Sequence, residues 1–148
     1  MHKRLAVMLV GAFFTVCTVS YVAATDKTSE QIVKEAKAAI KEVSVDDVKK
    51  MLDTKENIMV LDVTDKQEFE AGHIPGAINI SRGTLEFKVA LMIPDKNSKI
   101  VVYCGLDLRG PLATKTMNDL GYKNAVKMRG GLKAWKEAGY PIAKGILP

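Results

Sequence analysis

Residues 100–110, IVVYCGLDLRG, contain the side chains of this chain that are best placed to do chemistry. A short β-branched run ends at Cys104, a tight loop follows, and Arg109 precedes apolar residues with helical spacing. Gly110 suits the N-cap of that helix, and Pro111 suits its first position, where a missing N–H costs nothing. The pattern therefore predicts that Cys104 lies where a buried strand leads into a helix N-terminus.

A cysteine in such a position can act as a nucleophile. Loop amides and a helix N-terminus direct partial positive charge into the loop, which favours the thiolate over the thiol. The forked, permanently charged guanidinium of Arg109 can hold an anionic substrate group beside it. The alternative is a buried, inert cysteine at the end of a strand, which the local pattern alone leaves open.

Residues 1–24 have the layout of a secretory signal peptide. Two basic residues precede an apolar run without charges, and small residues at the end suit cleavage after Ala24. We therefore expect an exported, periplasmic protein, although the segment is also long enough to remain as an uncleaved membrane anchor. Cleavage would remove Cys17 and leave Cys104 alone, and a lone thiol in an exported protein is a candidate reactive group.

The composition is that of one globular domain. The chain has 148 residues, 47% of them hydrophobic, and a net charge of +5. The 22 basic residues less Lys3 and Arg4 leave 20 against 17 acidic residues after cleavage, a net charge of +3. The lysines are spread along the chain and few aromatic residues accompany them, so we expect no nucleic-acid partner.

Only one histidine, His73, follows residue 24, which makes it the candidate general base for Cys104. It begins the turn His-Ile-Pro-Gly, and we favour the simpler interpretation of a turn histidine that is hydrogen-bonded to the backbone or to a carboxylate. One histidine and one cysteine predict no metal site, and we expect no cofactor.

Short apolar strands alternate with helical patterns along the rest of the chain, which predicts an α/β domain with a mostly parallel sheet. We divide the chain into the signal peptide, an N-terminal amphipathic segment at 25–43 and one domain at 44–148. Within the segment, residues 28–43 predict a helix that covers part of the domain, with a membrane-surface helix as the alternative. The predicted strands are 58–63, 77–80, 100–103 and 125–128, and the predicted helices start near Ser44, Asp65, Arg82, Gly110 and Gly130.

Three stretches together resemble the rhodanese-like sulfurtransferases. Residues 61–77 contain Leu-Asp-Val, then Glu-Phe, then Gly-His-Ile-Pro-Gly-Ala, and residues 102–109 contain Val-Tyr-Cys with Arg109 five residues after the cysteine. Residues 130–141 contain Gly-Gly-Leu, a tryptophan and Gly-Tyr-Pro. The stretches occur in the family's order within residues 44–142. The signal peptide and single domain are most similar to periplasmic single-domain members, the phage shock protein E type.

The resemblance implies a three-layer α/β fold, with a five-stranded, mostly parallel sheet and helices on both faces. It implies that Cys104 takes a sulfane sulfur from a donor such as thiosulfate or polysulfide, holds it as a persulfide and passes it to cyanide or a thiol. The partners would be small sulfur-containing anions and thiol acceptors, with a membrane involved only if the N-terminal segment is not cleaved. The active-site and substrate-binding loop would be Gly105, Leu106, Asp107, Leu108, Arg109 and Gly110, whose amides cradle the persulfide while Arg109 stabilises the anion or the donor.

The sequence departs from the family pattern at three positions, two of them in this loop. Asp107 stands where a glycine is usual, Gly105 where a basic or polar residue is frequent, and Thr64 where an arginine is usual after Asp-Val. Asp107 tolerates a left-handed backbone, but we expect its carboxylate to oppose an anionic donor or to pair with Arg109. We expect Thr64 to affect packing more than chemistry.

Three functions remain open from the sequence. The first is a sulfurtransferase that uses Cys104. The second is a catalytically weak or inactive binding module, or a persulfide carrier, with Asp107 marking the altered loop. The third is a phosphatase, but phosphatases of related folds use a longer loop between cysteine and arginine than the one from Gly105 to Leu108.

Overall fold

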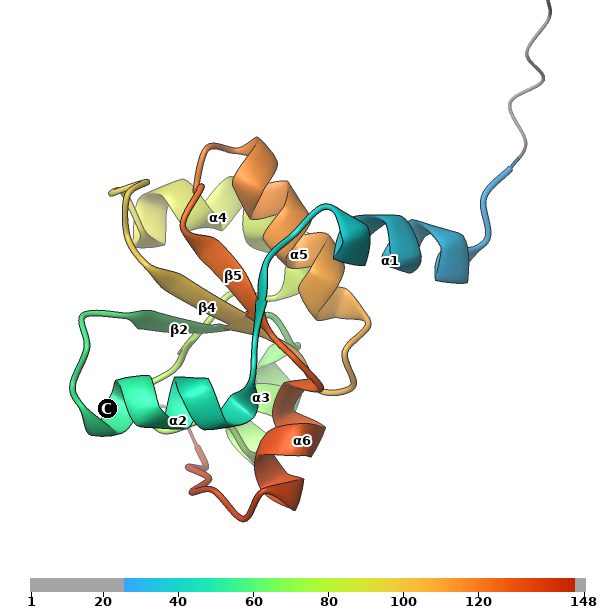
Figure 1. Cartoon of the computed structure of the whole chain (residues 1–148). Helices are drawn as coiled ribbons and strands as arrows, with labels where there is room; N and C mark the ends of the chain where they lie inside the picture. The colour runs from blue at the N-terminus through green and yellow to red at the C-terminus, as the bar shows by residue number, and fades with distance from the viewer. Residues whose placement is uncertain (1–25, 146–148) are drawn as a thin grey trace, which may run out of the picture.

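Residues 26–145 are described by a computed structural model of the chain, and the predicted signal peptide lies outside them. The described part is built on a five-stranded parallel sheet (Figure 1). Within this part, no helix combines the length and the apolar character that crossing a membrane requires. The strands, in the spatial order β1-β5-β4-β2-β3, are β1 (Glu42–Val43), β2 (Met59–Asp62), β3 (Ile78–Asn79), β4 (Ile100–Tyr103) and β5 (Ala125–Met128).

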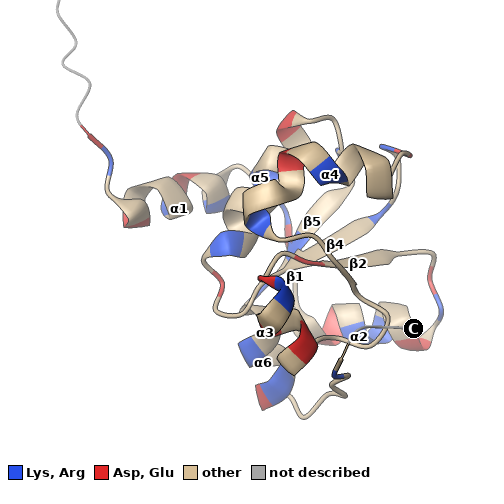
Figure 2. Ribbon diagram, turned by 180° about the vertical axis from the view of Figure 1, so that it is seen from behind, with Lys and Arg blue, Asp and Glu red and all other residues tan. Residues whose placement is uncertain are grey.

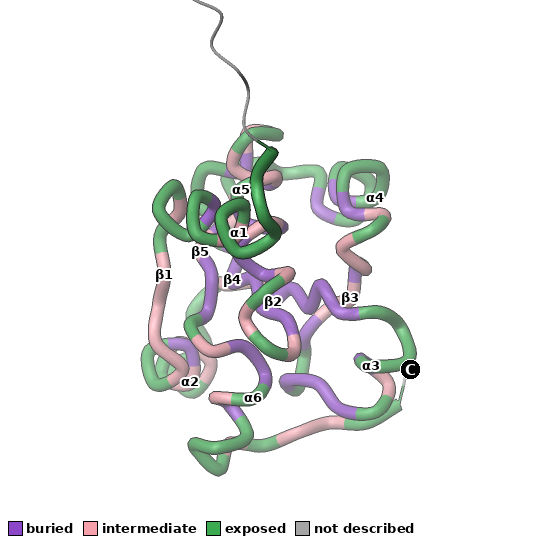
Figure 3. Tube along the Cα trace, turned by 90° about the vertical axis from the view of Figure 1, so that its right-hand side faces the viewer, coloured by how far each residue is buried: buried purple, intermediate pink, exposed green. Residues whose placement is uncertain are grey.

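Helices cover both faces of the sheet, so the domain has three layers (Figure 1). α4 and α5 contribute buried side chains to the apolar core on one face, and α2, α3 and α6 contribute to the core on the other. In Figure 3 the central strands β4 and β5 are largely buried, the edge strand β1 is intermediate, and α1 is mostly exposed. The helices are α1 (Ser29–Ala38), α2 (Val45–Asp53), α3 (Lys66–Ala71), the short 3₁₀ helix η1 (Arg82–Thr84), α4 (Leu85–Met92), α5 (Arg109–Asp119) and α6 (Gly131–Glu137). The expected three-layer α/β fold is thereby confirmed.

Local sequence signals account for most element boundaries. Ser44 caps α2 by accepting a hydrogen bond from the Asp47 amide, and Asp65 and Glu68 form a capping box at the start of α3. β4, between β2 and β5, is buried along its whole length, as its unbroken apolar sequence predicts for a central parallel strand.

The N-terminal segment differs from the prediction of one helix over residues 28–43. α1 ends at Ala38, and β1 at Glu42–Val43 then adds to the edge of the sheet beside β5. This pairing gives the amides of Lys127 and Arg129 the carbonyls of Lys41 and Val43 as acceptors. A longer helix would leave those strand amides without a partner. α1 itself packs against α5.

The start of α5 also differs from the prediction. The helix begins at Arg109, one residue before the predicted N-cap, and Leu108 at the N-cap offers no side-chain cap. Gly110 and Pro111 therefore lie inside the first turn, where proline still costs no helical hydrogen bond. The Gly110 amide, in the first turn of α5, has no acceptor within the helix and can donate to a group beyond its N-terminus.

Candidate active site

Cys104 is the first residue after β4, at the carboxyl end of the sheet, where open parallel sheets bind their ligands. Only 1% of the residue is exposed, and it is a free thiol. The amide of Gly110 donates a hydrogen bond to its sulfur at 3.2 Å. The structure thus places the thiol at the junction of strand and helix that the sequence predicts, with a backbone donor directed at it.

The N-terminus of α6 holds the loop from the other side. The amides of Leu132 and Lys133 donate to the carbonyls of Cys104 and Gly105, at 2.7 and 3.1 Å. Gly131, with φ of 63°, makes this approach possible, because a Cβ there would lie 2.3 Å from the Cys104 carbonyl oxygen. The Gly-Gly sequence that opens α6 therefore sets the position of the cysteine loop.

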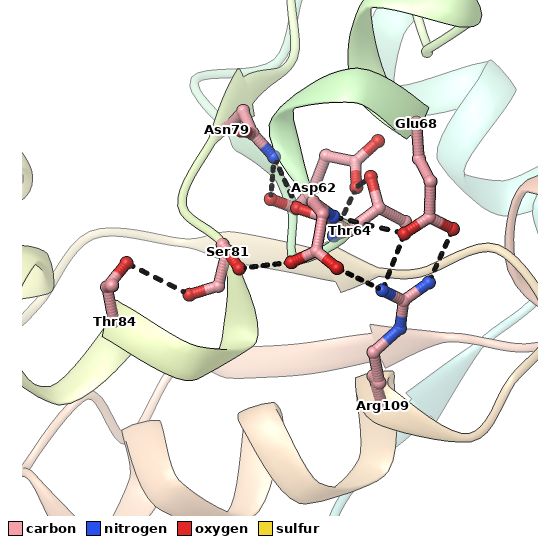
Figure 4. A network of polar contacts seen from close by, with 8 residues as sticks. Asp62, Thr64, Glu68, Asn79, Ser81, Thr84 and Arg109 are labelled. Carbon is pink, nitrogen blue, oxygen red and sulfur yellow. Dashed lines mark hydrogen bonds and ion pairs between the residues drawn. The ribbon is translucent and has the colours of Figure 1, made fainter.

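Arg109 is bound to Glu68 rather than free to face a ligand. Its two terminal nitrogens each donate to one carboxylate oxygen of Glu68 at 2.7 Å, the paired geometry that guanidinium and carboxylate prefer (Figure 4). These bonds are the main cause that holds the pKa of Glu68 below its ordinary value, and they raise the pKa of Arg109. Asp65 lies 3.6 Å from the guanidinium as a second negative neighbour.

The segment that carries Glu68 is itself fixed by hydrogen bonds. Glu68 accepts from the Asp65 amide at 3.2 Å, and the side chain of Asn79 donates to the carbonyls of Asp62 and Thr64 (Figure 4). These bonds join β3 to the end of β2 and to the connection that leads into α3, the helix that carries Glu68. The ion pair consequently ties α5 and the cysteine loop to a rigid part of the domain.

Asp107 does not pair with Arg109, contrary to one of the two expectations from the sequence. One carboxylate oxygen contacts the ammonium of Lys127 and accepts from the Gly130 amide at 3.1 Å. The other oxygen accepts from Lys37 of α1 at 2.7 Å. Although burial raises the pKa of Asp107, the hydrogen bonds from the two lysines outweigh it and the pKa lies below its ordinary value. Asp107 does adopt the left-handed conformation, with φ of 69°.

His73 does not have the features of a base for Cys104. Its Nδ1 lies 2.8 Å from the carbonyl of Phe69, and its ring is buried and stacks on the ring of Phe69 with centroids 3.7 Å apart. The interpretation of a turn histidine bonded to the backbone is confirmed. Thr64 is likewise buried and donates through its amide and hydroxyl to Asp62, and together with Gly105 and Leu106 it lines a hollow beside the cysteine loop.

Two hollows flank the cysteine loop. One, of about 490 Å³, is lined by Gly105 and Leu106 together with Lys133 and Lys136 of α6. The other, of about 500 Å³, lies between α1 and the start of α5 and is lined by Leu108. Leu106 and Leu108 are 67% and 59% exposed, so the loop presents an apolar rim to both hollows.

Among the charged partners around the loop, the sequence singled out only Glu68, as part of the Glu-Phe motif and not as a partner of Arg109. Glu68, Lys37, Lys127 and Glu42 come from four different elements, and nothing in their local spacing connects them to Cys104. Lys127 offered one signal, because a lysine within the apolar strand Ala-Val-Lys-Met implies a buried ammonium that needs an acidic partner. Basic and acidic residues are interspersed elsewhere along the helices (Figure 2). In residues 26–145 no group of three or more histidine, cysteine or acidic residues could hold a metal ion.

The comparisons with known proteins agree with this geometry. A family model described as Rhodanese-like domain matches residues 44–138. The chain is 30% identical over 101 residues to the putative sulfur carrier protein YrkF of Bacillus subtilis, covering 68% of this chain and 54% of that protein. It is 32% identical to the thiosulfate sulfurtransferase PspE of Escherichia coli, covering 57% of this chain and 78% of PspE. The chain therefore spans only about half the length of YrkF.

Two solved structures extend the comparison. A Rhodopseudomonas palustris protein named as a possible tyrosine phosphatase has a TM-score of 0.74 and 30% identity, over 80% of this chain and 96% of that one. The polysulfide-sulfur transferase of Wolinella succinogenes has a TM-score of 0.65 and 34% identity, over 76% of this chain and 85% of that one. Both solved structures are thus similar to this chain in fold and in sequence.

The contact between α6 and the loop gives a first prediction. Gly131→Ala should lower the unfolding midpoint more than Gly139→Ala, because both glycines have positive φ but only Gly131 has backbone where a Cβ would stand. The left-handed conformation alone costs alanine about 1–2 kcal/mol, so Gly139→Ala measures that part of the loss. Thermal unfolding followed by circular dichroism gives both midpoints. Equal midpoints for the two variants would show that the close approach to Cys104 is not required.

Proposed function

This chain belongs to the rhodanese-like domain family, and on that basis we propose that it is a sulfurtransferase that carries the transferred sulfur as a persulfide on Cys104. Its relatives include sulfurtransferases of this family, which supports sulfur transfer in general. The observation that carries the proposal is the hydrogen bond from the Gly110 amide to the Cys104 sulfur at the end of β4. A backbone donor in this position stabilises negative charge on sulfur without a separate base.

The proposed reaction has two steps. The Cys104 thiolate attacks the outer sulfur of the donor, a new S–S bond forms, and the donor's own bond to that sulfur breaks. The leaving group, sulfite for thiosulfate or the shortened chain for polysulfide, departs with the electron pair. A thiolate or cyanide then attacks the outer sulfur of the persulfide, and the Cys104 thiolate leaves with the electrons of the broken S–S bond.

Which compound donates the sulfur depends on the charges around the loop. Arg109 is engaged by Glu68, and Lys37 and Lys127 are engaged by Asp107, so none of these three cations is ready to receive a dianion. Thiosulfate therefore has to displace an existing ion pair or bind through loop amides together with Lys133 and Lys136, which line the hollow beside Gly105 and Leu106. Polysulfide, which the name of the Wolinella succinogenes transferase mentions, is the second donor in every assay.

Phosphatase activity is the second candidate, because the Rhodopseudomonas palustris neighbour is named as a possible tyrosine phosphatase. A phosphate group requires a free arginine, and the Arg109 guanidinium is held at both ends by Glu68. The loop from Gly105 to Leu108 is also short for a phosphate. Hydrolysis of p-nitrophenyl phosphate is the test of this candidate.

Mass spectrometry tests the persulfide directly. Incubation of the purified chain with thiosulfate or polysulfide should add the mass of one sulfur atom, and cyanide should remove it with formation of thiocyanate. In the chain that begins at Thr25, Cys104→Ser should show no gain, because Cys17 is absent and Cys104 is the only other cysteine of the sequence. Absence of any gain in the unaltered chain with either donor would reject the sulfurtransferase and leave a binding module as the function.

The role of Arg109 can be separated from donor binding. If Arg109 acts by holding the loop through Glu68, then Arg109→Gln and Glu68→Gln should both lower kcat/KM for the accepted donor, by about tenfold for each 1.4 kcal/mol lost. Glu86→Gln, which breaks a surface pair with Arg82, should leave kcat/KM unchanged and serves as the control. A lower KM for thiosulfate in Glu68→Gln would show instead that the freed arginine binds the donor.

We also propose that the protein is exported and acts outside the cytoplasm. The support is the charged start, apolar run and small-residue end of residues 1–24. The N-terminal sequence of the protein isolated from the producing cell should begin at Thr25. A chain that retains residues 1–24 and sediments with membranes would establish the anchored alternative.

A further inference from the structure

The carboxylate of Asp107 is held by hydrogen-bond donors from outside its own loop. Lys127 lies on β5, Gly130 in the connection from β5 to α6, and Lys37 on α1. The Asp107 side chain is 20% exposed, and its backbone occupies the left-handed region at φ of 69°. Side-chain bonds therefore hold an aspartate in a conformation that glycine adopts at no steric cost.

Lys127 is the unusual member of this group because its side chain is fully buried. An ammonium away from water costs several kcal/mol unless it is paired, and Lys127 has two carboxylates, Asp107 and Glu42, the latter at 3.0 Å. Glu42 on β1 is directly opposite Lys127 in the sheet. Two lysines and two carboxylates thus form one connected group, namely Lys37, Lys127, Asp107 and Glu42, and Arg129 adds a third cation at the Glu42 end, at 3.4 Å.

The buried lysine also lies close to the reactive sulfur. Lys127 is in register with Val102 of β4, and Cys104 follows two residues later, so all three side chains share one face of the sheet. A Cβ at Gly110 would stand 3.5 Å from the Cys104 sulfur and 3.6 Å from the Cγ of Lys127. The sulfur and the lysine stem therefore flank the same glycine of α5.

We propose that Lys127 is a positioning residue for sulfur transfer, which binds the Asp107 carboxylate, fixes the loop and keeps that negative charge neutralised beside the anionic sulfur. This rests on the proposed sulfurtransferase function. Without Lys127, the carboxylate keeps its exposed partner Lys37 but loses its buried one. The loop then carries an incompletely neutralised negative charge next to a reaction that builds negative charge on sulfur.

Paired substitutions test this assignment because the harm is predicted to come from Asp107. Lys127→Met keeps the aliphatic stem and should slow persulfide formation about tenfold, the effect of a like charge near an anion. The double variant Lys127→Met with Asp107→Asn should recover most of that rate, because the offending charge is gone. A lysine that served only to pack the sheet would not be rescued by a change at Asp107.

Lys37→Gln is the matched control. It removes the same charge from the same carboxylate, but Lys37 is 40% exposed and Lys127 remains in place, so the rate should fall by less than twofold. Unfolding midpoints of all four proteins show whether each variant is folded under the assay conditions.

The outcomes separate the two proposals. If the unaltered chain forms no persulfide with thiosulfate or polysulfide, the sulfurtransferase function fails first. If it does form one, a folded Lys127→Met variant with an unaltered rate would overturn the role of Lys127. A double variant no faster than Lys127→Met alone would overturn it equally, since the slow rate would then not arise from Asp107.

Discussion

The site depends on the close contact between the N-terminus of α6 and the backbone that follows β4. Two amides of α6 bind the carbonyls of Cys104 and Gly105, and Gly131 leaves no room for a side chain between them. With its carbonyls fixed in this way, the loop leads into α5, whose Gly110 amide donates to the sulfur. The Cys104 sulfur and the amide that donates to it are thus positioned by backbone groups, and this is the preorganised arrangement that the proposed reaction requires.

Ion pairs stabilise this arrangement from two further sides. Arg109 ties the beginning of α5 to Glu68 of α3, and Asp107 ties the middle of the loop to Lys127 and Lys37. Both sets join elements that are far apart in the chain. Their charges largely cancel, so the loop is electrostatically balanced rather than strongly cationic, and the exposed Leu106 and Leu108 give its rim an apolar character. Lys133 and Lys136, which line the hollow next to Gly105 and Leu106, are cations outside these two sets.

Much of the fold follows from local sequence. The unbroken apolar run of β4 predicts a central parallel strand, and Ser44 and Asp65 predict the helix starts that the structure shows. The predictions are wrong at the ends of helices, where contacts with residues distant in the chain set the boundary. α1 stops at Ala38 because Glu42 and Val43 find strand partners in β5, more than eighty residues away. α5 begins at Arg109, ahead of the glycine and proline that suggested its start.

By itself the sequence determined the family, the order of strands and helices from Ser44 onward, and the position of Cys104 at a strand end, because these depend on local propensity and short motifs. It also indicated that His73 has a structural role, since a turn histidine readily bonds to the backbone. Only the tertiary structure decided which charges meet. Asp107 was expected to oppose the donor or to pair with Arg109, yet it binds Lys127 and Lys37 while Arg109 binds Glu68. Ion pairing depends on distances of a few ångströms between residues remote in the chain, and these distances exist only once sheet and helices have packed.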